Sequence, residues 1–318
     1  MQYGAGVPTF PRHFDGKRFF NPDAPQAPGF LDLLRWKLTS HPSPSPSFIS
    51  DVQQSKPPAC VEDNRLQVTL INHSTVLLQQ NGSHILTDPI WSERASPFTS
   101  IGPRRRRKPG VRWEDLPRVD TVLLSHNHYD HLDLATLRRL ADRGQSEFIV
   151  PVGVAQLLRS HSIGPVHELD WGGSLPLAHA TVHCVPALHF SARGIFDRNQ
   201  TLWCGYVIEA ADRILYFAGD TAFGSHFARI RERFGPPRLA LLPIGAYEPR
   251  WFMSSVHMGP QDAVRAHHIL GAETSIAIHH GTFQLTDEAL DTPRMRLTEC
   301  APANSFLALD NGQSLTVE

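Results

Sequence analysis

Metal-binding residue types are concentrated in residues 125–133 of the sequence. Four side chains in this stretch carry an imidazole or a carboxylate: His126, His128, Asp130 and His131. These groups are ligands that zinc and related divalent ions commonly bind in proteins. On an extended loop, imidazoles at positions i and i+2 can face one ion, while the aspartate and histidine at i+4 and i+5 turn toward a second position. The alternative is a run of surface histidines beside a helix start.

The elements on either side of this stretch predict that it is a loop. Residues 119–124 are mostly apolar and are typical of a buried strand. Residues 132–141 place Leu134, Leu137, Leu140 and Ala141 at helical spacing. Loops between a strand end and a helix start are a common place for sites in α/β proteins.

Three further ligand types occur where predicted strands end. His189 follows the strand predicted at 181–186, Asp220 follows the one at 214–219, and His279 follows the one at 275–278. His280 is a rival for the last position, but neighbouring residues at a strand end face opposite sides. Only one of the two histidines is therefore expected to face the metals.

The order of these ligand types resembles the metallo-β-lactamase superfamily, whose H-x-H-x-D-H loop is matched by residues 126–131. The resemblance covers about residues 65 to 285. It implies an α/β fold, specifically a four-layer αββα sandwich, and two divalent metal ions. Zinc is the expected metal, although iron and manganese also bind histidine and aspartate. The family's late motif resembles residues 278–283 and places the ligand at His279.

The resemblance also assigns each side chain to an ion. It implies that the first ion is held by His126, His128 and His189. It implies that the second ion is held by Asp130, His131 and His279. In the superfamily an aspartate that matches Asp220 bridges the two ions.

Longer blocks resemble one branch of the superfamily, the phospholipases D that hydrolyse N-acyl-phosphatidylethanolamine. These blocks are residues 87–97, 125–133, 217–221 and 243–253. The resemblance implies release of an N-acylethanolamine and phosphatidic acid, by attack of a water molecule activated between two ions about 3.5 to 4 Å apart. It also places Asp88, Tyr129 and His257 around the metals, where they orient ligands or polarise the substrate.

Simpler interpretations exist for several of these residues. His257 could be bonded to backbone near a helix start, and Tyr129 could be a packing ring. Asp133 fits a hydrogen bond to a ligand imidazole as well as a helix cap. His73, at the end of the first predicted strand, allows a functional and a structural interpretation, as Asp133 does, and is left out of the expected site residues. The expected catalytic residues are Asp130, Tyr129, His257 and Asp88.

Three other functions compete with this hypothesis. A lactonase or a soluble phosphodiesterase would keep the metals and change the substrate. Nucleic-acid processing would need a broad basic surface, whereas 30 basic and 31 acidic residues give a formal charge of −1. A non-catalytic scaffold would be expected to lose ligands, and all seven positions are filled here.

Composition favours a cytoplasmic protein, free or peripheral on a membrane, and not a secreted one. The chain has 318 residues, 41% of them hydrophobic, which is enough for a large core. Its four cysteines lie far apart with no C-x-x-C pair, so a reducing compartment is expected. The N-terminus lacks a signal-peptide pattern, and no apolar run approaches 18 residues.

Residues 1–60 are rich in proline and predict an extended arm, followed by a hydrolase domain at 61–318. A short apolar helix is expected at 29–38, where it could lie in a membrane interface or pack against the body. The five cations at 104–108 predict a solvated face or a contact with lipid phosphates. The substrate partner is a phospholipid, and resemblance to dimeric enzymes implies a homodimer.

The remaining pattern predicts alternating strands and helices. An Asn81-Gly82 turn between apolar runs predicts a hairpin. A second hairpin is expected over 199–218, with its turn at Ala211-Asp212. Further strands are predicted at 66–71, 75–79, 84–87, 148–152, 166–169 and 239–242, and helices at 154–159, 225–233 and 261–270.

Overall fold

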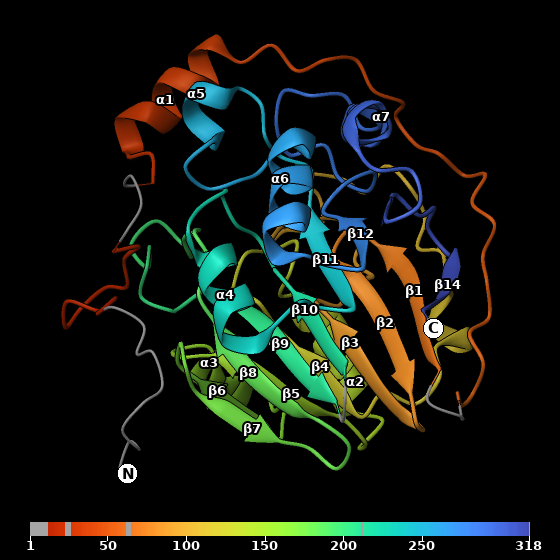
Figure 1. The fold of residues 1–318 in the computed structure, drawn as a ribbon. Helices are drawn as coiled ribbons and strands as arrows, with labels where there is room; N and C mark the ends of the chain where they lie inside the picture. The colour runs from red at the N-terminus through yellow and green to blue at the C-terminus, as the bar shows by residue number, and fades with distance from the viewer. Residues whose placement is uncertain (1–11, 23–26, 62–64, 211–212, 318) are drawn as a thin grey trace.

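The computed structural model describes residues 12–22, 27–61, 65–210 and 213–317. Two seven-stranded sheets pack face to face, and helices cover the outer face of each sheet (Figure 1). This arrangement confirms the predicted four-layer αββα sandwich. Side chains along each strand point alternately to the other sheet and to the helices, and this alternation builds the layers.

The first sheet contains the early strands of the chain. Its order is β14 (Ser314–Val317), β1 (Leu66–Asn72), β2 (Thr75–Gln80), β3 (Ser83–Thr87), β4 (Thr121–Leu123), β5 (Glu147–Pro151) and β6 (Val166–Leu169). Neighbours are antiparallel from β14 to β3 and parallel from β3 to β6. Asn81 and Gly82 join β2 to β3 with φ values of +50° and +72°, as expected for the predicted hairpin turn.

The second sheet contains the later strands. Its order is β13 (Phe306–Leu307), β12 (Thr274–Ile278), β11 (Leu239–Pro243), β10 (Arg213–Phe217), β9 (Gly205–Ala210), β8 (Thr181–Val185) and β7 (Ser174–Pro176). Neighbours are parallel from β10 to β13 and antiparallel from β7 to β10.

The hairpin expected over 199–218 is shorter than predicted. Its first strand begins at Gly205, because Asn199 has a left-handed φ of +60° and the N–H of Leu202 donates to Val152 near the other sheet. The predicted turn at Ala211-Asp212 lies outside the described residues.

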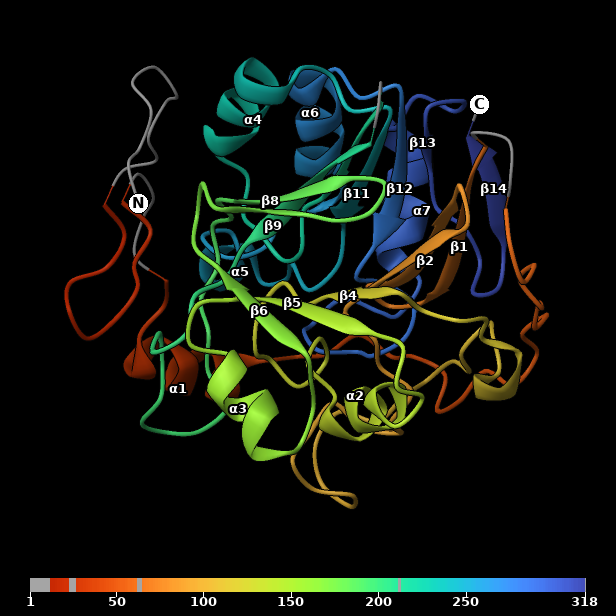
Figure 2. The ribbon, with the colours of Figure 1, turned by 90° about the horizontal axis from the view of Figure 1, so that it is seen from below.

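Helices cover both sheets (Figure 2). The first sheet packs against α2 (Leu134–Ala141) and α3 (Ala155–Ser160), and the second against α4 (His226–Phe234), α6 (Pro260–Leu270) and α7 (Thr292–Cys300). The short helices α1 (Phe30–Thr39) and α5 (Arg250–Met253) lie together, and a 3₁₀ turn covers Trp113–Asp115. None of the helices in the described ranges has the length and apolar character that crossing a bilayer requires.

Alternation along the strands builds three apolar layers. Leu70 and Phe217 lie between the sheets, whereas their neighbours Ile71 and Tyr216 face the helices. With apolar side chains at both sets of alternating positions, central strands such as β2 and β11 are buried on both faces. The loops at the strand ends are thereby held on a rigid frame.

The N-terminal arm packs on the body at several points, and Trp36 provides one of them. Trp36 of α1 is buried, stacks on Phe252 at a ring distance of 5.1 Å, and donates its indole N–H to Asp287 at 3.2 Å. Farther along, bridges join residue 49 to 107 and residue 55 to 111. Packing of α1 is therefore observed, while the domain boundary at residue 60 stays a prediction.

The cation run at 104–108 is not a uniformly solvated face. Arg105 is almost completely buried, and its guanidinium donates to Asn72 Oδ1 and to the carbonyls of Ile90 and Ser92. Arg107 donates to the carbonyl of Gly281 and to the carboxylate of Asp291. The carbonyls of Ile90, Ser92 and Gly281 lie in loops outside the strands, and these arginines donate hydrogen bonds to them.

Candidate metal centre

Three imidazole nitrogens converge in the first half of the site. His126 Nε2 lies 2.8 Å from His128 Nδ1, and His128 Nδ1 lies 3.2 Å from His189 Nε2. Two of these residues come from the loop between β4 and α2, and His189 comes from the loop after β8. A loop that follows a strand of the first sheet therefore meets a loop that follows a strand of the second sheet.

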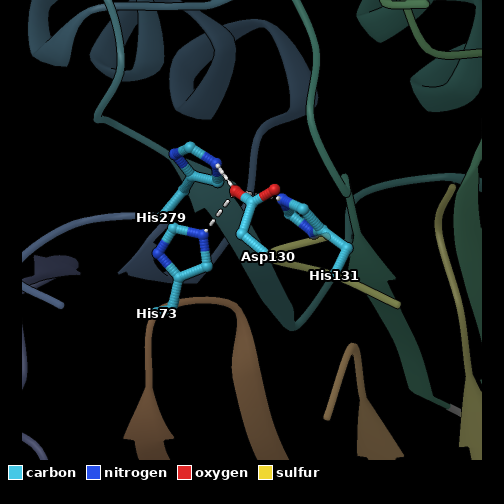
Figure 3. Close-up of side chains that lie close together, drawn as sticks. All are labelled: His73, Asp130, His131 and His279. Carbon is cyan, nitrogen blue, oxygen red and sulfur yellow. Dashed lines mark hydrogen bonds and ion pairs between the residues drawn. The ribbon is translucent and has the colours of Figure 1, made fainter. Parts of the chain in front are cut away.

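A carboxylate and two imidazoles form the second half (Figure 3). Asp130 Oδ2 lies 3.3 Å from His131 Nε2 and 3.2 Å from His279 Nε2. His279 directly follows β12 and has a left-handed φ of +58°. Gly245, after β11, permits this turn, because a Cβ there would lie 2.0 Å from the His279 carbonyl oxygen.

Asp220 lies between the two halves. Its Oδ2 is 3.1 Å from the Nε2 atoms of both His131 and His279, and 3.7 Å and 3.9 Å from those of His189 and His126. Its Oδ1 is buried and makes no hydrogen bond among the described residues, and the same is true of His131 Nε2. A buried carboxylate oxygen without a donor is costly unless a cation or a proton approaches it.

The donor atoms fit two divalent cations. Zinc–nitrogen bonds of about 2.0 to 2.1 Å in a tetrahedron put the ligand atoms about 3.4 Å apart. The observed separations of 2.8 and 3.2 Å in the first half and 3.1 to 3.3 Å in the second are close to that edge. The seven residues assigned from the sequence are therefore brought together in space.

Asp88 supports the second half from behind. It follows β3, has a φ of +33°, and accepts the Nδ1–H of His131 at 2.6 Å. The backbone N–H and the hydroxyl of Ser125 also donate to this carboxylate, at 2.7 and 2.6 Å. A carboxylate on the far nitrogen fixes the tautomer and orientation of a ligand imidazole. Asp88 thus orients His131.

The first half has similar supports. His126 Nδ1 lies 2.9 Å from the hydroxyl of Ser125, and His189 Nδ1 lies 2.9 Å from the carbonyl of Val256. Both Nδ1 atoms are therefore placed to donate, which leaves each Nε2 lone pair directed at the centre.

The electrostatics differ between the two halves. Burial lowers the pKa of His126 well below its ordinary range, that of His128 to about 3 and that of His189 to about 4. These imidazoles are neutral, which is the form that binds metal. Burial also acts to lower the pKa of His131 and His279, but nearby carboxylates, chiefly Asp220, outweigh it and raise that of His279 to about 9.

Tyr129 supports the loop through contacts with Arg193. Its hydroxyl donates to the carbonyl of Arg193 at 2.9 Å, and the Arg193 guanidinium lies 3.9 Å from the centre of its ring. The same guanidinium donates to the carbonyls of Asn127 and Leu132 at 2.8 and 2.9 Å. Arg193 therefore joins the two loops that carry ligands, and no sequence pattern indicated this role.

His257 and His280 occupy contrasting positions. His257 Nδ1 lies 3.9 Å from Asp220 Oδ2, is buried, and makes no hydrogen bond within the described ranges. His280 is also buried and lines a small space with Leu285 and Leu290, but among the described residues it forms no ion pair with Asp220, whereas His279 does. The structure thus brings His279 to the centre in preference to its neighbour.

Two residues have roles that the sequence did not decide. Asp133 caps α2 by accepting from the N–H of Ala135 and the hydroxyl of Thr136, at 3.2 and 2.6 Å. His73 Nε2 lies 2.9 Å from Asp130 Oδ2, where it can donate to the carboxylate, and His73 belongs to a buried group with Asp130, His131 and His279. The sequence indicates a role for His73 only through its position between two apolar predicted strands.

Comparison with known proteins identifies the family. The model of the beta-lactamase superfamily domain matches residues 83–280, which include all seven candidate ligands. The chain belongs to this superfamily. An isothiocyanate hydrolase structure from Delia radicum gut bacteria, 23% identical, superposes with a TM-score of 0.63 over 78% of this chain and 98% of that one. Because the two sequences are only 23% identical, this structural similarity shows that the fold is shared and nothing more.

Two relatives within the superfamily are more similar in sequence. N-acyl-phosphatidylethanolamine-hydrolyzing phospholipase D 1 of Caenorhabditis elegans is 38% identical, across 94% of this chain and 92% of its own. The mitochondrial enzyme of the same name from Saccharomyces cerevisiae is 34% identical, across 78% of this chain and 56% of its own.

Metal binding should release protons. In the metal-free chain at pH 7, His131 and His279 carry protons because their pKa values are raised, so a cation must displace them. Calorimetry of zinc binding in buffers of different ionisation enthalpy is expected to report about two protons released. Affinity should rise with pH as His131 and His279 lose their protons, which for His279 happens at about 9. Binding heats that do not depend on the buffer would contradict this expectation.

Proposed function

We propose that this chain is a metal-dependent phosphodiesterase of phospholipase D type, which hydrolyses N-acyl-phosphatidylethanolamine to N-acylethanolamine and phosphatidic acid. The observation that carries the proposal is the 38% identity, over nearly the full length of both chains, to an enzyme named for this hydrolysis. The fold alone would not select a substrate, since one fold hosts many reactions.

We propose that two Zn²⁺ ions occupy the centre. The first would be held by His126, His128 and His189, and the second by Asp130, His131 and His279, with Asp220 between them. A donor set dominated by imidazole favours zinc over magnesium or calcium. When bound, the ions would lower the pKa of water and neutralise charge on the phosphoryl oxygens.

The hydrolysis balances with water as the only co-substrate. A water oxygen forms a bond to phosphorus, the phosphorus–oxygen bond to the N-acylethanolamine breaks, and the departing oxygen takes a proton. No serine or cysteine nucleophile is needed. The supports of Asp88 and Ser125 keep the His131 and His126 rings fixed while the phosphate binds.

His257 is the side chain that we assign to the phosphate headgroup. It is buried beside Asp220, and its ring lies 4.9 Å from that of His189. Burial lowers its pKa well below the usual range, so the imidazole is neutral. A neutral ring can donate one N–H to the departing oxygen or to a phosphoryl oxygen, and its Nδ1 has no other partner in the described part of the chain.

Removing the His257 ring should slow the chemical step. The variant His257→Gln is expected to lower kcat about a hundredfold, as for loss of a positioned proton donor. Its zinc content should stay that of the parent chain. His268→Gln, an exposed histidine of α6, is the control and should keep full kcat. A His257→Gln enzyme with normal kcat would remove this residue from the reaction.

Product analysis tests the function itself. The zinc-loaded chain is incubated in H₂¹⁸O with N-palmitoyl-phosphatidylethanolamine in detergent micelles, and the products are measured by mass spectrometry. We expect N-acylethanolamine without the label and phosphatidic acid with one ¹⁸O. Asp130→Asn should lose metal and activity together. Hydrolysis of a soluble lactone or a bis-aryl phosphate, without hydrolysis of the phospholipid, would refute the proposal.

We also propose that one apolar face of the protein rests on the membrane. On α1, Phe30 is 74% and Leu31 77% exposed, and in the 193–198 loop Ile195 is 88% and Phe196 83% exposed. The two segments are neighbours, since Arg198 donates to the carbonyl of Pro28 just before α1 (Figure 1). Exposed apolar side chains gathered in this way mark interaction sites.

This face adjoins the candidate metal centre. Phe190, in the same loop, packs on the His128 ring at 4.6 Å and also against the apolar group formed by Trp36 and Phe252. A phospholipid drawn from a bilayer at this face would therefore reach the metals over a short path. The path follows the loop that begins at His189.

Vesicle binding tests the proposed membrane face. Leu31→Ser and Phe196→Ser remove exposed side chains, so each should leave folding intact and weaken binding to phosphatidylcholine vesicles about tenfold, as for loss of one buried apolar group. Met295→Ser, an exposed residue of α7, is the control and should bind as the parent does. Equal vesicle binding by all variants would refute the membrane contact.

A further inference from the structure

His73 is a buried histidine for which the proposed reaction gives no role. It lies in the turn between β1 and β2, is 1% exposed, and has a left-handed φ of +46°. Glycine or asparagine would suit such a turn better than histidine does. Strained backbone persists where the surroundings hold it, and it gathers at functional sites.

The ring of His73 contacts the second half of the candidate centre. Its Nε2 lies 2.9 Å from Asp130 Oδ2 (Figure 3). The ring centre lies 4.2 Å from that of His279, and Phe283 meets it edge-on at 5.4 Å. Arg105 packs over the other side of Phe283, so the ring is held from behind.

The backbone of His73 binds the loop that carries His279. Its N–H donates to the hydroxyl of Thr282 at 2.9 Å, and its carbonyl accepts the N–H of His279 at 2.9 Å. The same residue therefore contacts two ligand loops that are about 150 positions apart in the sequence. Asp130 is held through the side chain and His279 through the main chain.

Geometry separates a supporting role from direct metal binding. Asp220 Oδ2 lies 3.1 Å from the Nε2 atoms of His131 and His279, and this defines the second metal position. Within the described ranges, His73 forms an ion pair with Asp130 and none with Asp220. Its Nε2 is directed at the Asp130 carboxylate. His73 also offers a nitrogen within 4.8 Å of ligand atoms of Asp130, His131 and His279, so its supporting role rests on the direct contact with Asp130 Oδ2.

We propose that His73 is a positioning residue, which donates its Nε2–H to Asp130 and thereby fixes the carboxylate oxygen that binds the second cation. The inference rests on the metal centre of the proposed function and is independent of the substrate. A histidine that donates from Nε2 has its lone pair on Nδ1, and Nδ1 of His73 has no hydrogen-bond partner among the described residues. A neutral ring with its proton on Nε2 can therefore donate to Asp130 without leaving a second N–H unpaired.

Two variants separate the hydrogen bond from the packing. His73→Gln keeps an N–H donor close to the position of Nε2, whereas His73→Phe keeps the ring and removes the donor. Affinities for the first and second equivalents of zinc are measured on the metal-free chain by competition with a chelator. Cobalt(II) absorption then reports the coordination of each ion.

We expect His73→Phe to weaken the second equivalent 10- to 100-fold and leave the first within threefold, the usual size for loss of such a support. His73→Gln should bind both equivalents within threefold of the parent. Buried His84 lies outside the centre, where its Nδ1 contacts the carbonyl of Arg118, and His84→Phe is the control expected to bind both ions normally.

Other outcomes would overturn the proposal. Equal weakening of both equivalents in His73→Phe would indicate a general structural role, and unchanged binding would indicate no role. Failure of His73→Gln to restore the second equivalent would indicate that the ring itself is required. Since no lipid is present in this experiment, an error in the proposed substrate would leave its result unaffected.

Discussion

Three buried carboxylates impose the main constraint on this structure. Asp88, Asp130 and Asp220 are almost fully enclosed, and in the described parts of the chain none of them forms an ion pair with a lysine or an arginine. Burying an uncompensated carboxylate costs several kcal/mol, on the order of the whole stability of a domain. Their charge is therefore matched by imidazoles, which carry protons or share cations. This requirement explains why loops from both sheets converge at one place.

The topology brings these loops together. β3 and β4 are parallel neighbours, so Asp88 and the loop that begins at His126 leave the first sheet at the same edge. β10, β11 and β12 are also parallel, which places Asp220 and His279 at one edge of the second sheet. The carboxyl ends of parallel strands are the usual place for a site in α/β proteins. Packing the two sheets face to face then joins the two edges.

Local sequence was sufficient where the signal was local. The spacing of the 126–131 loop, and the strand ends before His189, Asp220 and His279, predicted residues that the structure brings together. Most of the individual elements also followed from apolar periodicity, whereas the αββα fold was implied by the resemblance to the superfamily. The strand expected from residue 199 begins only at Gly205, because Asn199 has a positive φ and the N–H of Leu202 donates to Val152, just after β5 of the other sheet.

Contacts between distant segments could not be predicted in this way. The contacts of Arg193 with Asn127, of His73 with Asp130 and of Arg105 with Asn72 join residues that lie 66, 57 and 33 positions apart. The run at 104–108 gave charge but no indication that Arg105 would be enclosed. For Tyr129 and Asp133 the residue type allowed two roles, and only the positions of Arg193 and of the α2 backbone distinguish them.

The packing of Phe190 has a consequence for the N-terminal arm. One side of this ring covers the His128 imidazole, and its other contacts include the Trp36 group that α1 completes. A chain shortened to begin at residue 61 would lack Trp36, so solvent would gain access to the back of Phe190. The local dielectric around the first three imidazoles would then increase. The described residues of the N-terminal arm thus limit the access of solvent to the first three imidazoles, and none of the seven candidate ligands comes from them.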